Sequence, residues 1–324
     1  MTALPENHPM ISSIAEREPG SPSISVIIAV YNGGEGLHLC IQALRESAHP
    51  PLEMIVVDDG STDGSASVAA SLGCRVLSTG GRKCGPAKAR NVGAEKARGD
   101  LLLFFDADVV PAPDTIEKVA DAFRREPDLD ALFGSYDDQP AASNFLSQYK
   151  NLLHHYIHQQ GGEEVATFWC GCGAVKRDVF LHAGGFDDRR YRRPSVEDIE
   201  LGYRITSAGG RIRLDKSLQV KHLKRWTAIS LLKSDIFDRG IPWAKLLVIY
   251  PRLPKDLNLN VTGRFSVVAS FILAGSLLAV AVIPQSAVTA LCAALFLTAA
   301  NSRLYLWFAA QRGPLFAAGA VPWH

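Results

Sequence analysis

The sequence predicts an α/β fold, with a mainly parallel sheet, helices on both of its faces, and transmembrane helices at the C-terminal end. Short apolar, β-branched segments alternate with segments of helical periodicity through the first half of the 324 residues. Strands that are apolar on both faces are typical of a parallel sheet covered by helices. The chain after Arg264 carries almost no charge, which favours a membrane region there.

Four strands are predicted in the first third of the chain, and three of them run directly into polar clusters. The strands cover residues 25–30, 54–57, 75–78 and 101–105. A helix is expected over residues 86–98, with proline in its first turn, where a missing N–H costs nothing. The polar clusters begin at Tyr31, Asp58 and Asp106. Because ligands bind at the carboxyl ends of such strands, we expect the three clusters to share one site.

The middle of the chain is less regular than its beginning. An amphipathic helix rich in His and Tyr is predicted around residues 144–159, and a glycine-rich segment follows at 168–174. Another helix is expected to open at 195–198, and residues 218–222 have the pattern of a strand end.

Two apolar segments near the C-terminus predict a membrane hairpin. Residues 265–283 contain no charge, and this segment is long enough to span the hydrocarbon core of a bilayer. A second span is expected over 287–308, and residues 313–324 have the composition of a partial third element. Positive charges flank the hairpin but are absent from its turn, so both ends are expected in the cytoplasm. Buried core helices are the alternative interpretation.

These patterns predict four parts of the chain: a disordered leader at 1–22, a catalytic domain at 23–228, an interfacial helical linker at 229–262 and a membrane region at 263–324. The leader has no apolar stretch of a signal peptide, so we expect a multi-pass protein of the inner membrane with its catalytic domain in the cytoplasm. The formal net charge of +1 gives no reason to expect nucleic acid as a partner.

Two carboxylates at one strand end suggest a metal site. Asp106 and Asp108 follow five apolar residues, and a hard cation such as Mg²⁺ or Mn²⁺ prefers carboxylate and phosphate oxygens. A pair that only caps a loop is the alternative. At the end of an earlier strand, Asp58 either accepts hydrogen bonds from a nucleobase or belongs to a capped turn.

An ordered set of motifs gives the chain a family resemblance. The motifs lie at residues 26–32, 57–63, 89–91, 105–108, 184–186 and 197–198. In that order they resemble glycosyltransferase family 2, whose members are inverting enzymes with the GT-A fold, a Rossmann-like α/β fold. The resemblance covers roughly residues 23 to 225, and the membrane tail is similar to that of bacterial members acting on lipid-linked or envelope glycans.

The resemblance implies roles for individual residues. Asp198 matches the catalytic base, and His222 matches a histidine that joins the metal or the diphosphate. Asp106 and Asp108 match the motif whose last carboxylate binds the metal. The positions that correspond to donor binding are Ala29, Val30, Tyr31, Asn32, Asp58, Arg90, Asn91 and Asp106.

Several of these side chains have a structural alternative. Ser195 and Asp198 also fit a capping box at the start of a helix, with Glu197 favouring the same helix terminus. A base would not be needed if the acceptor were a phosphate. Trp169, with Gly171 beside it, either stacks on an acceptor sugar or packs in a tight turn. We expect the acceptor site between this turn and Glu197.

The basic and imidazole side chains outside these motifs are harder to interpret. Lys224 and Arg225, after His222, can meet either diphosphate oxygens or lipid headgroups. Three histidines on the helix around residues 144–159 are interpreted as packing or surface residues: His154, His155 and His158.

The sequence thus predicts a metal-dependent transferase that moves a sugar from a nucleotide-diphosphate sugar to a lipid-linked or glycan acceptor at a membrane. Two alternatives stay open at this point. One is a sugar nucleotidyltransferase, which also combines a parallel sheet with a metal. The other is a non-catalytic, membrane-anchored sugar-binding or scaffold protein.

Overall fold

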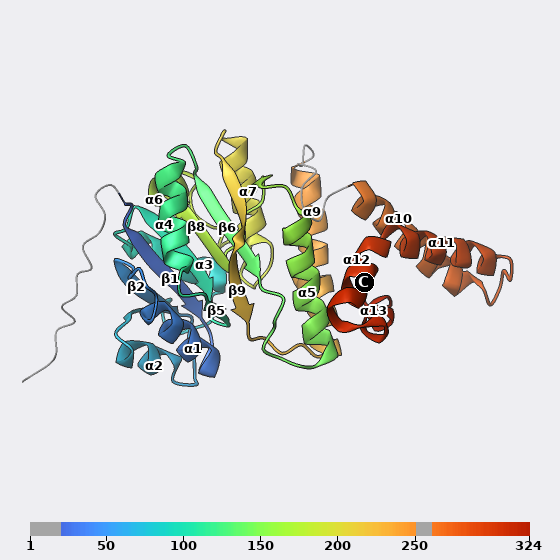
Figure 1. The fold of residues 1–324 in the computed structure, drawn as a ribbon, viewed down its shortest axis with the longest axis horizontal. Coiled ribbons are helices and arrows are strands. Elements are labelled where there is room, and N and C mark those ends of the chain that lie inside the picture. Colours follow the sequence, from blue (N-terminus) through green and yellow to red (C-terminus); the bar gives the residue numbers. More distant parts are fainter. Residues whose placement is uncertain (1–20, 251–260) are drawn as a thin grey trace, which may run out of the picture.

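The computed structural model describes residues 21–250 and 261–324. A nine-stranded sheet forms the centre of this part of the chain, with helices on both faces, and a helical hairpin extends away from it (Figure 1). The strands are β1 (Ile24–Val30), β2 (Glu53–Asp58), β3 (Arg75–Ser78), β4 (Leu101–Asp106), β5 (Val109–Pro111), β6 (Ala131–Tyr136), β7 (Glu164–Val165), β8 (Cys172–Lys176) and β9 (Ile212–His222).

The described helices alternate with these strands and continue after the last of them. They are α1 (Gly34–Arg45), α2 (Ser65–Ser71), α3 (Pro86–Lys96), α4 (Thr115–Arg125), α5 (Phe145–Gln160), α6 (Arg177–His182), α7 (Glu197–Ser207), α8 (Ala228–Lys233), the π-helix η1 (Ser234–Gly240), α9 (Ile241–Ile249), α10 (Val261–Ala279), α11 (Ser286–Ala300), α12 (Ser302–Arg312) and α13 (Pro314–Ala320).

The sheet is parallel in its first half and mixed in its second. Its order is β3-β2-β1-β4-β8-β6-β9-β5, with β7 paired to β9. Strands β3, β2, β1 and β4 are all parallel neighbours, whereas β8 runs antiparallel to both β4 and β6. The predicted α/β fold with helices on both faces is confirmed, and "mainly parallel" describes the half of the sheet that carries the strand-end motifs.

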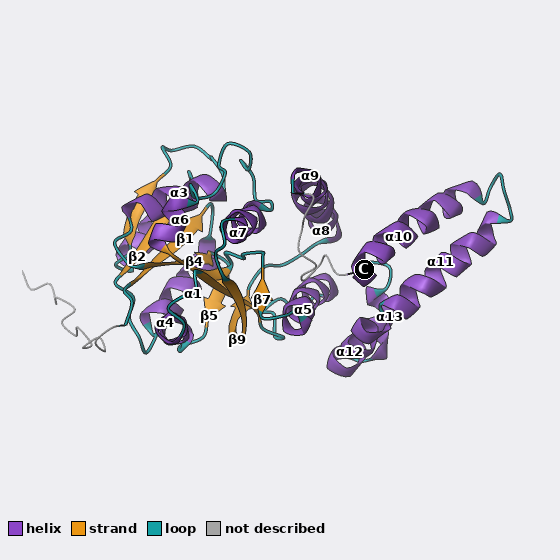
Figure 2. Ribbon diagram, turned by 90° about the horizontal axis from the view of Figure 1, so that it is seen from above, coloured by secondary structure: helices purple, strands orange, loops and turns teal. Residues whose placement is uncertain are grey.

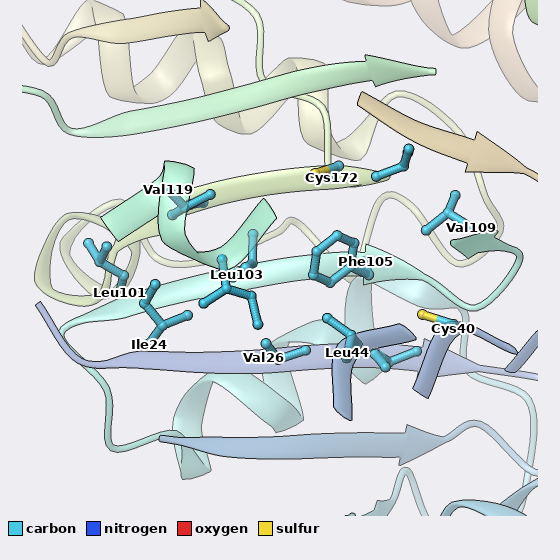
Figure 3. Packing of buried hydrophobic residues seen from close by; sticks show 14 of the residues in the cluster. Ile24, Val26, Cys40, Leu44, Leu101, Leu103, Phe105, Val109, Val119 and Cys172 are labelled. Atoms are coloured by element: carbon cyan, nitrogen blue, oxygen red, sulfur yellow. The ribbon is translucent and has the colours of Figure 1, made fainter. Parts of the chain in front are cut away.

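Two apolar layers cover the two faces of the sheet. Leu101, Leu103 and Phe105 of β4 point to the side covered by α1 and α4, where Figure 3 shows them beside Val26 and Val119. The alternate residues of β4 belong to the other layer, under α3, α6 and α7 (Figure 2). Because successive side chains of a strand point to opposite faces, a strand buried on both sides must be apolar throughout. Burial of β4 on both faces therefore explains the unbroken apolar run before Asp106.

The start of α7 differs from one of the two structural interpretations of its sequence. Helix α7 begins at Glu197, and its N-cap residue Val196 makes no side-chain capping bond. The capping box considered for Ser195 and Asp198 does not form. The carboxylate of Asp198 is therefore not used to cap the helix in that way.

The C-terminal helices are long and apolar but not two straight spans. Within α10, residues 262–279 are apolar enough to cross a membrane, and 6% of this window is buried. The second predicted span, 287–308, is divided: α11 and α12 meet at a bend of 62°. At this bend Asn301 donates its side-chain amide to the Leu297 carbonyl and to Ser266 Oγ of α10. A side-chain amide that bonds the last turn favours the end of α11 there.

Helices α12 and α13 pack back onto α5 of the catalytic region. Phe308 of α12 is fully buried in a cluster with Tyr149 and Leu152 of α5 and with Ala320 of α13. Arg312 donates to Gln148 Oε1 at 3.0 Å and to the Asp138 carbonyl at 2.7 Å. The partial third element expected at 313–324 is therefore a short helix seated against the domain.

The remaining predicted boundaries fall partly beyond the described residues. Almost all of the leader at 1–22 and the segment 251–260 of the expected linker lie outside them. Within the described part of the linker, α8, η1 and α9 form one nearly continuous helical stretch (Figure 1).

Candidate active site

A cavity of about 470 Å³ lies at the carboxyl ends of the parallel strands. Most of the side chains predicted for the site line this cavity. They are Ala29, Val30, Tyr31, Asn32, Arg90, Asp106, Asp108, Trp169, Glu197, Asp198 and His222. Residues more than 100 positions apart in the sequence thus meet in one place, as expected for the carboxyl edge of such a sheet.

Strand register explains why these residues meet. Ala29 of β1 pairs with Asp106 of β4, and Val30 pairs with Asp58 of β2. On the other side of the site, Val109 of β5 pairs with His222 of β9. The three strand ends that the sequence marks with polar residues are therefore neighbours because their strands are hydrogen-bonded in register.

Arg90 connects the end of β4 to the beginning of α7. Its guanidinium donates to Asp106 Oδ1 at 2.7 Å and to Glu197 Oε1 at 2.9 Å. Both Arg90 and Glu197 are buried, and the second carboxylate oxygen of Glu197 accepts the Ser195 N–H at 2.8 Å. Charge-assisted bonds of this kind are the strong ones, and they fix α7 against the strand. Both oxygens of Glu197 accept hydrogen bonds, so its side chain positions Arg90, and its expected contact with the acceptor stays a prediction.

Asp108, in the turn between β4 and β5, lies close to His222 at the end of β9. His222 Nε2 lies 3.7 Å from Asp108 Oδ2, and the imidazole stacks on Tyr136 with ring centroids 4.1 Å apart. Burial alone would raise the pKa of Asp108, but His222 and the nearby Lys224 outweigh it, so this pKa lies below its ordinary value. The carboxylate is thus ionised and faces an imidazole whose ring plane is fixed by stacking.

The predicted three-residue metal set is not assembled as such. Asp106 is held by Arg90, which leaves Asp108 and His222 as the close pair. In residues 21–250 and 261–324, no three acidic, His or Cys side chains are grouped as a metal cage. One carboxylate and one imidazole nonetheless fit a divalent ion that takes its other ligands from phosphate and water oxygens.

Asp198 lines the cavity at the first turn of α7. Its Oδ2 accepts the Cys170 N–H at 3.2 Å, and its Oδ1 accepts the Ile199 N–H at 2.8 Å. Burial raises the pKa of Asp198 above its ordinary value, and the charge of Arg90 opposes this shift without cancelling it. A partly buried carboxylate with a raised pKa is a better proton acceptor than an exposed one.

Three predicted site residues do not line the cavity. Asp58 accepts the Ser61 N–H through Oδ1, as the turn interpretation expects, and its contact with a nucleobase stays a prediction. Asn91 exchanges two hydrogen bonds with the backbone of Phe186 and so holds the 184–186 loop. Gly171 packs under the Trp169 ring, where a Cβ would collide with the indole. These three residues hold loops and turns around the cavity, and the ligand contacts expected of them stay predictions.

Asp59, which the sequence left without a role, also lies at the edge of the cavity. It is 3% exposed, lines the cavity and accepts the N–H groups of Cys84 and Gly85, each at 2.8 Å. These bonds fix the loop that carries Lys83, whose ammonium lies 3.7 Å from the centroid of the Tyr31 ring. The strand ends β1 and β2 thus present an aromatic ring and a cation together.

The backbone at Asn32 is unusual in a way that suits a binding edge. Asn32 has φ of 53°, the left-handed region that asparagine tolerates better than most residues. Its side-chain oxygen accepts the Thr62 N–H at 2.8 Å, and its own N–H donates to Ser61 Oγ. The two loops after β1 and β2 are therefore tied together at the rim of the cavity.

Comparison with known proteins agrees with this geometry. The family model described as "Glycosyl transferase family 2" matches residues 25–183, which contain β1, β2, β4 and the Asp106 and Asp108 motif. The chain belongs to glycosyltransferase family 2. The predicted family is confirmed.

Relatives of this glycosyltransferase family 2 chain include proteins from bacteria and archaea. The pre-mycofactocin glycosyltransferase of Mycobacterium tuberculosis is 30% identical over 236 residues, which are 65% of this chain and 47% of the relative. The chain therefore spans about half the length of that relative. The glucosyl-dolichyl phosphate glucuronosyltransferase of Haloferax volcanii is 25% identical over 252 residues, 72% of this chain and 80% of the relative.

The fold has a counterpart among solved structures. A mannosyltransferase of Pyrobaculum calidifontis superposes with a TM-score of 0.57 and 20% identity, covering 93% of this chain and 87% of that one. This likeness confirms the GT-A fold.

Sequence reasoning missed much of one side of the cavity in this family 2 chain. His154 and His158 of α5, interpreted as packing or surface residues, line it beside Tyr136 and Trp169. Burial lowers the pKa of His158 to about 4, so its imidazole is neutral. The cavity also has cationic side chains that no family motif contains: Lys150, Lys224 and Arg239. Only Lys224 stands near a recognised motif.

Proposed function

We propose that this chain is a metal-dependent, inverting glycosyltransferase that moves a hexosyl group from a nucleotide-diphosphate sugar to a hydroxyl of a membrane-associated acceptor. One observation carries the proposal. A single cavity joins the Tyr31 rim, the Asp108–His222 pair and the half-buried carboxylate of Asp198. Donor recognition, leaving-group stabilisation and proton removal need these three elements within reach of one sugar.

The nucleoside end of the donor is assigned to the rim. Tyr31 is 42% exposed, and its ring is available to stack with a base, while the loop held by Asp59 supplies Lys83. The backbone of residues 29–32 and the side chain of Arg90 complete this edge. The solved mannosyltransferase to which the fold is similar is described as a complex with GDP-Man and Mn²⁺, which supports a nucleotide-sugar donor for the same fold.

The diphosphate end is assigned to Asp108 and His222, which would hold a divalent ion, Mg²⁺ or Mn²⁺. Bound there, the ion would neutralise the charge that develops on the leaving diphosphate. The chain's own part is to keep Asp108 ionised and His222 oriented by its stack on Tyr136. Arg90 keeps Asp106 in place beside them.

Asp198 is assigned as the base. The acceptor oxygen forms a bond to the anomeric carbon, the bond from that carbon to the diphosphate oxygen breaks, and the hydroxyl proton passes to the Asp198 carboxylate. Attack from the side opposite the leaving group inverts the anomeric centre. The Cys170 N–H holds the accepting carboxylate in position. Trp169, which lines the cavity on the same side, offers its face to the acceptor sugar.

The membrane part of the proposal rests on α10 and the α11–α12 pair. Helix α10 exposes Phe271 and Leu278 at 77% and 83%. Exposed apolar surface of this extent marks a membrane or partner surface. Arg264 and Arg303 flank the hairpin, which supports a cytoplasmic location of the catalytic domain at the inner membrane. The name of the Haloferax volcanii relative includes a sugar-carrying dolichyl phosphate, which supports a lipid-linked acceptor.

The test is nucleotide release from a panel of UDP- and GDP-sugars by the purified full chain, with Mn²⁺, with Mg²⁺ and with EDTA. We expect release from at least one donor with either metal and none with EDTA. Absence of release and of transfer with every donor and membrane-extracted acceptor would favour the non-catalytic scaffold. Release of pyrophosphate in place of a nucleoside diphosphate would favour a nucleotidyltransferase.

A further inference from the structure

Three cations line one side of the cavity, which we call the cationic wall. They are Lys150 of α5, Lys224 just after β9, and Arg239 of η1. None of them belongs to a strand end of the parallel half of the sheet. The cationic wall therefore needs an explanation separate from the donor motifs.

Two of the three cations of the cationic wall have no ion-pair partner among the described residues, although carboxylates such as Asp108 and Asp238 line the same cavity. Lys150 pairs with Asp235, but among the described residues no carboxylate pairs with Lys224 or Arg239. The other acidic residue of η1, Asp238, pairs instead with Arg193 at 3.5 Å. Lys224 lies over the Trp226 ring, 4.2 Å from its centroid. Unpaired cations at a cavity surface are the features that attract an anion.

The three cations are close enough to affect one another. Burial lowers the pKa of Lys150 to about 8, and the positive charges of Arg239 and Lys224 contribute in the same direction. Lys224 also acts on Asp108, and Arg239 on Tyr136. The cationic wall is therefore continuous with the metal-binding end of the cavity.

The π-helix gives this wall its shape. Within the seven residues of η1, Asp235 reaches Lys150, Asp238 reaches Arg193, and Arg239 reaches the cavity. A π-helix turns more slowly per residue than an α-helix, so it changes which side chains share a face, and π segments are frequent at functional sites.

The same segment exposes a large apolar surface. Ile229 of α8 is 81% exposed, Phe237 of η1 59% and Val248 of α9 81%. Trp226 and Trp243 line the cavity nearby. A single helical stretch thus presents apolar side chains outward and a cation inward. An anion held by this wall and attached to an apolar chain would satisfy both surfaces.

We propose that the cationic wall binds the phosphate of a lipid-phosphate acceptor, whose apolar chain lies along the α8–η1–α9 segment. This rests on the proposed function and deepens it, since it names the acceptor's chemical class. The phosphate is a recognition group, and a sugar hydroxyl beyond it is the nucleophile that Asp198 deprotonates. Donor phosphates have their own place at Asp108 and His222, so the wall is assigned to the acceptor.

The experiment measures binding by the full chain in neutral detergent, without donor and without metal. Undecaprenyl monophosphate, undecaprenol and phosphatidylglycerol are titrated separately, with the intrinsic tryptophan fluorescence of the chain, to which Trp226 and Trp243 contribute, as the signal. We expect saturable binding of the monophosphate, with roughly tenfold weaker binding in each of Arg239→Gln and Lys224→Gln, because each removes a charge-assisted contact. Lys245→Gln, an exposed cation of α9 outside the cavity, should change the affinity less than twofold.

Three outcomes would overturn the proposal. Equal affinity for undecaprenol would mean that the phosphate is not recognised, and equal affinity for phosphatidylglycerol would mean general attraction to anionic lipid. Unchanged monophosphate binding in both cavity variants would place the phosphate elsewhere. Because the titration contains no donor, it can fail while metal-dependent nucleotide release persists, and the reverse also holds.

Discussion

The two sides of the cavity are formed by different kinds of structural element. The donor side consists of strand ends and of Arg90, whose two ion pairs tie β4 to α7. The cationic wall consists of helical and loop side chains, of which Lys224 and Arg239 are exposed and unpaired among the described residues. A hydrogen-bonded strand register fixes the first side, whereas the second side depends on how helices pack.

Because the two sides are held in different ways, we expect the side chains of the cationic wall to vary with the acceptor and those of the donor side to stay the same. Strand ends held in a buried sheet can keep Ala29 beside Asp106 whatever the acceptor is. Lys150 of α5 and Arg239 of η1 lie outside the six motifs, so we expect side chains at these positions to follow the acceptor's chemistry. Functional residues often lie on connections positioned by a rigid scaffold. Substitutions on the donor side should therefore impair donor binding or stability, and substitutions on the cationic wall should impair acceptor binding.

The largest effect is expected for Asp198→Asn, which removes the base and keeps the shape. Transfer should fall by about 10²–10⁴-fold, the usual contribution of a positioned general base. Binding of the nucleoside diphosphate with Mn²⁺ should stay within about twofold of wild type, because Asp198 is assigned to the acceptor's proton and not to the donor. The measurement is steady-state nucleotide release beside equilibrium binding. Glu95→Gln, an exposed amide substitution on α3, is the matched control, and full activity in Asp198→Asn would remove the base from the mechanism.

The next effect concerns stability on the donor side. Arg90→Met leaves the buried Glu197 and the half-buried Asp106 without their cation, and breaking a buried pair in this way costs about 3–5 kcal/mol. Urea denaturation of the full chain in detergent measures the free energy of unfolding. Arg98, whose side chain is 68% exposed beside Glu53, gives the control variant Arg98→Met, which should cost less than about 1 kcal/mol. Equal losses in the two variants would show that Arg90 is not a structural link.

The pH dependence of transfer tests the environment of Asp198. Burial raises its pKa, and only the ionised carboxylate accepts a proton. Activity should therefore be full above this raised pKa and should fall about tenfold per pH unit below it, starting at a higher pH than an ordinary carboxyl allows. Rates are measured at saturating donor and Mn²⁺. A profile that is flat down to the ordinary carboxyl range, or an unchanged acid limb in Asp198→Asn, would contradict the assignment.

The smallest effect separates two adjacent carboxylates. Asp59→Asn weakens the charge-assisted bonds to Cys84 and Gly85 and so loosens the Lys83 loop, for which we expect roughly a tenfold rise in donor KM. Asp58→Asn keeps an acceptor for the Ser61 N–H and should change donor KM less than about twofold, as surface substitutions usually do. The reverse order would restore the nucleobase role that the sequence suggested for Asp58.

The fold was predictable because its signals are local. An apolar run such as 101–105 between turn signals is typical of a strand buried on both faces, and the following carboxylates mark its carboxyl end. The bend at Asn301 was not predictable, because it depends on a contact with Ser266 of another helix. The antiparallel half of the sheet also lacks a local signal, since β8 and β9 are joined to their neighbours across long stretches of sequence.

The site was predictable to the extent that it lies at strand ends. Asp108 and Asp198 fall in motifs and His222 ends a predicted strand, and the structure brings the three to one cavity. Asp58 and Asp59 are adjacent and alternate in direction, so sequence alone does not tell which of them points inward. The wall residues Lys150 and Arg239 enter through the packing of α5 and η1, which no spacing in the sequence indicates.

The donor and the acceptor phosphate are assigned to different sides of the cavity, and one measurement tests this division. It is the affinity of a nucleoside diphosphate in the presence of Mn²⁺, compared between Asp108→Asn and Arg239→Gln. Asp108→Asn removes one of the two proposed metal ligands, and we expect metal-dependent affinity to fall at least about tenfold. Arg239→Gln should leave it within about twofold, since its cation is assigned to the acceptor. Equal losses in the two variants would contradict the division of the cavity.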